Sequence, residues 1–173
     1  MDEVPESPTG EQIASELIPS QNIVGDDEQD TVLLRKMSDE AKDYISSFPW
    51  CATILDEYFG GGVGGIFAIF FLHIRPNRTG IDPWIWVVVG DVPSAYLPVA
   101  DCQSPAQVFR TYINGMSKWV ELARLGKTGT PDQGVPPVHV PATPEWAERL
   151  NQKLYGLTLA VKPFFEDESN TVN

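Results

Sequence analysis

Residues 66–90 read IFAIFFLHIRPNRTGIDPWIWVVVG, and this stretch decides the fold class. Two apolar runs, 66–74 and 84–89, flank a loop full of turn-forming residues. Each run is rich in β-branched and aromatic residues and is apolar on both alternating faces, which is typical of a strand covered on both sides. The short loop favours antiparallel pairing, because parallel strands need a crossover of about a dozen residues or more.

Further strands are predicted on either side of a helical segment. Residues 94–99 can add a third strand, and Pro98 confines it to an edge because proline cannot donate to the ladder. Residues 138–140, Val-His-Val, can add a fourth, short edge strand. The sequence therefore predicts a small antiparallel meander of about three to four strands.

Four segments indicate helices. Residues 30–48 have apolar side chains at helical spacing, and Pro49 ends this segment and opens a second helix that Gly60 closes. A third helix begins at the N-cap Ser104, with Pro105 at its first position and a capping box completed by Gln107, and Gly126 ends it. A fourth begins at 143–145, where Gly156 weakens it by about 1 kcal/mol relative to alanine. The expected fold class is α+β, a small antiparallel sheet packed with about four helices.

Charge divides the chain into unequal parts. The 173 residues include 24 Asp and Glu and 12 Lys and Arg, a net charge of -12. Residues 1–30 contain nine of the acids and no base. Their polar, aperiodic composition predicts a disordered acidic tail, although a short docked stretch over 13–18 stays open. We expect a single α+β domain over 31–165 and a frayed C-terminal tail over 166–173.

Composition argues against several classes of function. Nucleic-acid binding needs clustered Lys and Arg, and an acidic segment repels a phosphate backbone. The longest apolar run, 63–74, has 12 residues, where a membrane-spanning helix needs roughly 20. Residues 1–10 lack the basic and apolar regions of a secretory signal. We expect a cytoplasmic protein that binds neither nucleic acid nor membranes.

No catalytic, metal or cofactor motif fits its predicted context. Gly60, Gly62 and Gly65 match G-x-G-x-x-G, but a helix leads in and a strand leads out, the reverse of the dinucleotide-binding order. The histidines and cysteines have no zinc-ligand spacing: His73, His139, Cys51 and Cys102. Cys51, in the first turn of the second predicted helix, is interpreted as a core residue. Asp56 and Glu57 point about 100° apart on a helix and form no acid pair there.

The aromatic pattern of the second strand suggests where binding occurs. Trp84 and Trp86 share one strand face. If all helices cover one face of the sheet, the other face stays open and apolar, which marks an interaction surface. If helices cover both faces, the core is enclosed. Arg75 and Arg78 in the loop could bind an anionic group. The candidate binding residues are Trp84, Trp86, Arg75, Arg78 and Asp91.

Several motifs carry a family resemblance: SFPWC at 47–51, the glycines and Ile-Phe at 60–67, WIWVVVGDVP at 84–93 and PATPE at 141–145. With them, most of residues 40–160 resembles a family of small bacterial proteins of unknown function. The resemblance implies no activity for any residue. Small acidic bacterial α+β proteins of this kind include immunity proteins, which bind and block toxins, so the likeness in size and charge implies a basic toxin as partner.

We therefore expect a non-catalytic protein-binding module, of which an immunity-type inhibitor of a basic toxin is one version. The alternatives are a small-molecule-binding or enzymatic domain with its site between sheet and helices, and a structural homo-oligomer subunit. A deep pocket with convergent polar groups favours the small-molecule or enzymatic domain. A filled core with a flat apolar face favours protein binding.

Overall fold

A computed structural model describes residues 6–136, 138 and 140–166 of the chain. Its helices are α1 (Gly10–Ser15), α2 (Glu28–Ser46), α3 (Pro105–Arg124) and α4 (Pro144–Glu166), with 3-10 turns η1 (Ser20–Asn22) and η2 (Pro131–Gln133). Its strands are β1 (Ile18–Pro19), β2 (Cys51–Val63), β3 (Phe67–Pro76), β4 (Trp84–Gly90) and β5 (Ala95–Pro98). The α+β class predicted from the sequence is confirmed.

In the described part of the chain the strands form one antiparallel meander in the order β1-β2-β3-β4-β5. The two runs of the 66–90 stretch pair as expected, from Phe67 opposite Gly90 to His73 opposite Trp84. β5 lies at an edge and ends at Pro98, also as expected. The predicted number of strands was too low, since the sheet has five rather than three to four.

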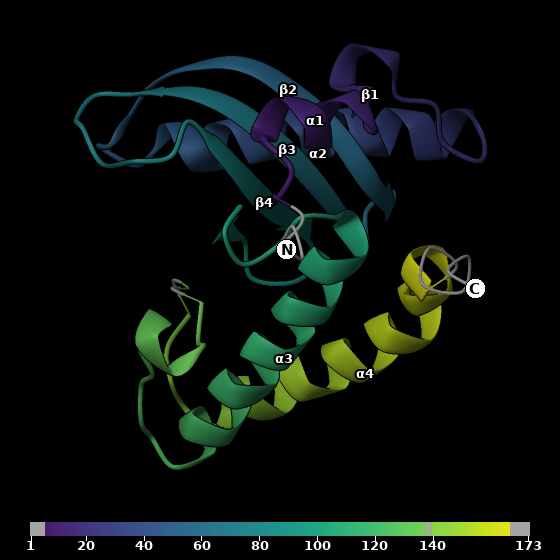
Figure 1. The fold of residues 1–173 in the computed structure, drawn as a ribbon. Helices are drawn as coiled ribbons and strands as arrows, with labels where there is room; N and C mark the ends of the chain where they lie inside the picture. The colour runs from purple at the N-terminus through teal and green to yellow at the C-terminus, as the bar shows by residue number, and fades with distance from the viewer. Residues whose placement is uncertain (1–5, 137, 139, 167–173) are drawn as a thin grey trace, which may run out of the picture.

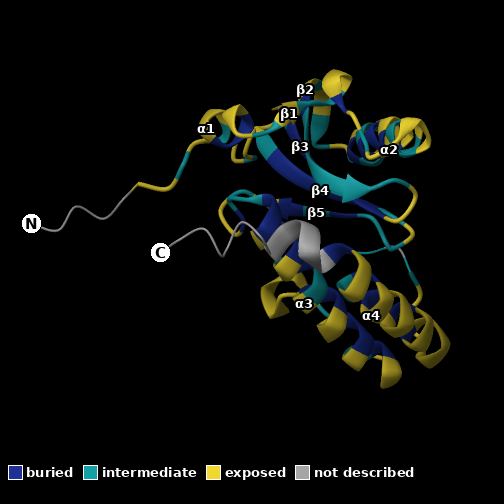
Figure 2. Ribbon diagram, turned by 90° about the vertical axis from the view of Figure 1, so that its right-hand side faces the viewer, coloured by how far each residue is buried: buried dark blue, intermediate teal, exposed yellow. Residues whose placement is uncertain are grey.

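Helices cover both faces of this sheet (Figures 1 and 2). α2 lies on one face, where it packs against alternate β3 residues such as Phe70 and Leu72. α3 lies on the other face against Phe67, Ile69 and Phe71, and α4 packs against α3. The enclosed core is therefore the correct alternative. No open apolar sheet face exists among the described residues.

The predicted start and end of α3 and the predicted start of α4 are confirmed. The Ser104 hydroxyl accepts a hydrogen bond from the Gln107 amide at 3.2 Å and caps α3. The Gln107 side chain, however, accepts from the Gln103 amide at 2.7 Å, one residue before the N-cap. Val138 and Val140 lie in no strand, so the expected edge strand at 138–140 is wrong for the two positions that the structure describes, and His139 lies outside them.

Residues 51–59 correct the prediction of a second helix, because they belong to β2. The pairing of β2 with β3 slips at three bulges, two of which leave Ala52 and Leu55 as extra residues. Each extra residue shifts the two-residue alternation of a strand. Ile54 and Tyr58, four positions apart, therefore pack on opposite faces of the sheet, and because both faces are covered their spacing imitates that of a helix.

Residues 10–30 differ from the disordered tail that their composition predicts. They form α1, β1, η1 and the first residues of α2, and Ile13 and Ile23 are buried in opposite cores. Two well-placed apolar residues outweigh the acidic composition because the surrounding charges stay in solvent. The packed unit thus begins before residue 31, and α1 occupies part of the docked stretch left open above. Residues 1–5 and 167–173 lie outside the described ranges.

The glycine-rich segment at the end of β2 allows close packing. A strand, not a helix, leads into Gly60, and β3 leads out, so the order still fails the dinucleotide pattern. A Cβ at Gly64 would lie 2.7 Å from both Asp30 Oδ1 and Leu33 Cβ. The Gly64 amide donates to Asp30 Oδ1 at 2.7 Å, which ties the β2–β3 turn to the start of α2.

None of the described helices is both long and apolar enough to cross a membrane.

Replacing Gly10 by alanine should detach α1 from the sheet. A Cβ at Gly10 would overlap the indole of Trp84, against which this residue lies. We expect Gly10→Ala to reduce the free energy of unfolding by about 1–3 kcal/mol, the usual cost of overpacking. Urea unfolding measures this loss. Glu11→Ala, an exposed change on the same helix, is the control, and equal stabilities of the two variants would contradict the docking of α1.

Gly156→Ala should stabilise the protein. Gly156 is exposed inside α4, and a Cβ there would meet no atom within 4 Å. Alanine removes the backbone entropy that glycine loses in a helix, a gain of about 0.5–1 kcal/mol. Thermal unfolding measures the gain. A loss of stability would show that this face of α4 is covered in solution.

Candidate functional site

The five residues predicted to bind a ligand do not form one site. Trp84 and Asp91 lie at opposite ends of β4, about 20 Å apart at the rise of an extended strand. Arg75 and Arg78 are exposed near the Trp84 end. Asp91 instead forms an exposed ion pair with Lys153 of α4, at 2.9 Å. This ion pair lies in a separate groove of ≈ 610 Å³ between α4 and the turn after β4.

Both tryptophans have packing roles. Trp86 is fully buried, and its Nε1 donates to the carbonyl of Cys102 at 2.8 Å. Trp84 is half-buried and stacks on His73, with 4.2 Å between ring centroids. His73 Nδ1 lies 3.4 Å from Asp56 Oδ2. Across the described ranges, no group of three or more His, Cys, Asp or Glu side chains is arranged to hold a metal ion.

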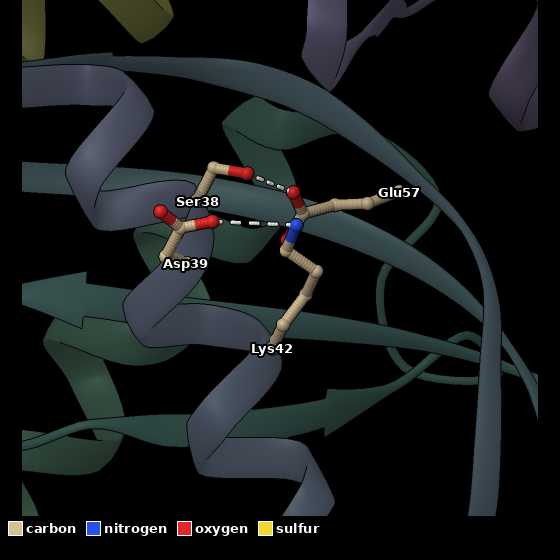
Figure 3. A network of polar contacts seen from close by, with 4 residues as sticks. All are labelled: Ser38, Asp39, Lys42 and Glu57. Atoms are coloured by element: carbon tan, nitrogen blue, oxygen red, sulfur yellow. Dashed lines mark hydrogen bonds and ion pairs between the residues drawn. The ribbon is translucent and has the colours of Figure 1, made fainter. Parts of the chain in front are cut away.

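Ser38 and Glu57 define the strongest candidate site. Both side chains are polar and buried: Ser38 is 5% exposed and Glu57 is 8% exposed. The Ser38 hydroxyl donates a hydrogen bond to Glu57 Oε1 (Figure 3). Glu57 Oε2 is buried and has no hydrogen-bond partner. Buried polar atoms of this kind are uncommon and need an explanation.

The residue spacing on α2 and the alternation of side chains along β2 place Ser38 and Glu57 opposite each other. On α2, Arg35, Ser38, Asp39 and Lys42 follow the spacing of one helix face. On β2, Glu57 shares its face of the sheet with Phe59 and points toward α2. Its neighbour Asp56 points to the opposite face, where it meets His73.

These residues line a cleft of ≈ 820 Å³ between α2 and β2, which we call the α2–β2 cleft. Its walls come from β1 and η1, from one face of α2, and from β2. The lining residues are Pro19, Ser20, Gln21, Arg35, Ser38, Asp39, Lys42, Ile54, Leu55, Asp56, Glu57 and Tyr58. The Ser20 hydroxyl is also buried without a hydrogen-bond partner. Unpaired polar atoms from two elements therefore belong to residues of one cleft.

Burial raises the pKa of the Glu57 carboxyl, because desolvation disfavours its charged form. The Ser38 and Ser20 hydroxyls and the positive charge of Lys42 lower this pKa, and the negative charge of Asp39 adds to the increase. Ser20 lies close enough to favour the charged carboxylate without meeting the geometry of a hydrogen bond. The net direction is upward, so the folded protein holds the Glu57 proton more tightly than the unfolded chain does.

Both bases of the cleft already have partners. Lys42 Nζ lies 3.4 Å from Asp39 Oδ1 (Figure 3), and Arg35 donates to the Ile23 carbonyl at 3.3 Å. The Lys42–Asp39 pair is exposed, and such pairs contribute less than about 1 kcal/mol. Glu57 is thus the ionisable group on the α2 side of the cleft whose hydrogen bonding is left incomplete, beside the unpaired Ser20 hydroxyl.

The sequence interpretation missed Glu57 because it placed residues 49–59 in a helix. On that helix Asp56 and Glu57 point about 100° apart and form no acid pair. On a strand they point to opposite faces, and Glu57 falls at an inward position beside apolar residues. The signal that could have found it is a lone acid at such a position, once β2 is recognised as a strand.

Comparison with known proteins finds no matching family model, no similar curated protein and no similar solved structure. The site is therefore interpreted from its own chemistry.

Glu57→Gln should make the stability of the protein less dependent on pH. Because its folded pKa is raised, Glu57 contributes stability below its unfolded pKa, and this contribution is lost as pH rises through the folded pKa. We expect the variant to gain on the wild type between pH 5 and 8, ending more stable by on the order of 1 kcal/mol, because glutamine stays neutral where the buried carboxyl must ionise. Urea unfolding across this range measures it, with exposed Asp43→Asn as control. A difference that does not change with pH would contradict the assignment.

Proposed function

We propose that this protein is a non-catalytic protein-binding module that recognises its partner at the α2–β2 cleft. The observation that carries the proposal is the Glu57 carboxyl, which is buried, has one unpaired oxygen and lines an open cleft. An unpaired buried acceptor costs about 1–3 kcal/mol, and a partner that supplies a donor recovers this free energy. The free protein therefore leaves a hydrogen-bonding position that a polar group of the partner can fill.

The rim of the cleft supports a protein partner. Leu55, an extra residue of a β2 bulge, is 41% exposed, and Ile18, beside Pro19 of the cleft wall, is 49% exposed. Exposed apolar side chains around a polar pocket resemble the mixed surface that protein interfaces bury. The described part of β1 pairs with β2 at Tyr58 and Phe59 alone, which leaves the outer edge of residues 51–57 without a strand.

The partner is expected to bind through side chains rather than by adding a strand. The bulges at Ala52 and Leu55 interrupt the regular ladder of the free edge. Bulges of this kind protect edges against strand pairing and re-aim side chains near binding sites. A partner segment of more than two or three residues would lose register there.

The concrete version of this proposal is an immunity-type inhibitor of a basic bacterial toxin. The net charge of -12 favours association with a basic protein. Complementary charge increases the association rate and makes it sensitive to salt.

A small-molecule or enzymatic site in the same cleft is the second candidate. The raised pKa of Glu57 favours it, because general acids are carboxyls whose pKa lies closer to neutral pH. A protein partner accounts in addition for the exposed apolar rim, so we place it first.

Capture of a partner by the tagged protein from its source cells tests the proposal. Leu55→Glu adds a charge at the rim of the cleft. Leu125→Glu makes the same change at the end of α3, where Leu125 is 70% exposed and lies outside the cleft lining. We expect one basic protein in stoichiometric yield with the wild type and Leu125→Glu. Leu55→Glu should reduce its recovery at least tenfold, and high salt should also reduce it.

Two results would overturn the proposal. Equal recovery with both variants would place the interface elsewhere. Recovery of the bait alone, with a discrete oligomer by light scattering, would favour the homo-oligomer subunit, for which Tyr155 and Leu159 on the exposed side of α4 are available.

A further inference from the structure

We infer that the α2–β2 cleft takes the cationic side chain of a Lys or Arg residue of the partner, with Glu57 as its acceptor. This inference rests on the proposed function, because it assumes that the cleft is the binding site. It goes beyond that function by specifying the charge of the group that binds in the cleft and the residues that select this charge.

The charges that line the cleft favour a cation. Two carboxylates, Asp39 and Glu57, face two bases, Arg35 and Lys42, while the side chain of Asp56 points to the other face of the sheet. Arg35 is hydrogen-bonded to a backbone carbonyl, and Lys42 is paired with Asp39. An entering anion would have to break these contacts and lie against Glu57. An entering cation would pair with the carboxyl that the free protein leaves incomplete.

The hydrogen-bond acceptors of the cleft also favour a cation. The Ser38 hydroxyl donates to Glu57 Oε1, so the ionised carboxylate that a cation stabilises already accepts on one oxygen and has Oε2 left to accept. The unpaired Ser20 hydroxyl, close to Glu57, can accept a second hydrogen bond. Guanidinium and ammonium groups supply several donors and no acceptor. They match two neighbouring acceptors better than a neutral group with a single donor does.

The walls of the cleft also suit a long side chain with a charged end. Ile54 and Leu55 contribute apolar surface along the β2 wall. The methylene stems of Lys and Arg pack along such surface while their charged ends reach polar groups. The cleft of ≈ 820 Å³ has room for one such side chain and for its hydration.

The effect of removing the Lys42 charge on ligand affinity distinguishes a cationic ligand from an anionic one. Its positive charge acts on Glu57 and would repel an entering cation. Removing this charge should therefore strengthen the binding of a cation, whereas removing the charge of Glu57 should weaken it. For an anionic ligand both signs are reversed, and for a zwitterion both changes weaken binding.

The experiment is a titration of the ¹⁵N-labelled full chain, followed by amide chemical shifts. The probe is Nα-acetyl-arginine amide, whose only charge is on the side chain. Nα-acetyl-citrulline amide is its neutral isostere, and Nα-acetyl-glutamate amide is the anionic probe. We expect the arginine probe to shift amide signals of residues 35–42 and 54–58. Glu57→Gln should weaken its binding at least tenfold, as for loss of a charge-assisted hydrogen bond, and Lys42→Met should strengthen it several-fold.

Matched variants on α2 give the controls. Asp43→Asn and Lys36→Met remove the same charges at exposed positions outside the cleft lining, and neither should change the affinity more than about twofold. The dispersion of the amide spectrum shows directly whether each variant is folded.

The remaining outcomes overturn the inference and separate it from the proposed function. Equal binding of the citrulline and arginine probes would show that the cleft does not select charge. Binding of the glutamate probe, lost in Lys42→Met, would show that the ligand is anionic. Both results leave the cleft as a binding site. If no probe shifts the cleft residues, the inference fails, and the capture experiment with Leu55→Glu decides the proposed function on its own.

Discussion

The burial of β3 on both faces is the constraint on which the rest of the structure depends. Residues 67–72 are fully buried in succession, so neither face of this strand can meet water. Such a strand needs a neighbour at each edge and a helical layer on each face. β4 is one neighbour and α3 one layer, as the sequence indicates. The other edge must also be filled, and this requirement draws residues 51–63 into β2 although their spacing imitates a helix.

The helical layer formed by α2 completes the candidate site. α2 packs its apolar face on the sheet and turns Ser38 toward β2. The bulge at Leu55 allows Ile54 and Glu57, three positions apart, to face the same side, where regular alternation would place them on opposite sides. A carboxyl is thereby held beside apolar residues and hydrogen-bonded on one oxygen. The pKa shift and the incomplete hydrogen bonding of Glu57 have this single cause.

The amino-terminal segment completes both the core and the cleft. Ile13 and Ile23 anchor it to opposite sides of the sheet, and between them η1 brings Ser20 next to Glu57. Composition argues for disorder here because acids dominate the count. Packing follows from position instead, since a few apolar side chains at the right separation suffice to dock a short segment. Hydrophobic anchoring of this segment thus supplies one wall of a polar site.

Local sequence by itself determined the α+β class, the antiparallel pairing of β3 with β4, the edge position of β5 and the starts of α3 and α4. Each of these follows from residues close together in the chain, such as the Ser104 cap or the paired apolar runs of 66–90. Only the tertiary structure decided that residues 51–59 form a strand, that residues 10–23 pack, and that Trp84, Trp86, Arg75, Arg78 and Asp91 do not meet in one site. It also decided that Ser20, Ser38 and Glu57 do come together. The physical reason is that register, bulges and burial depend on which distant segment lies alongside, and a buried carboxyl is recognisable only when its neighbours are known.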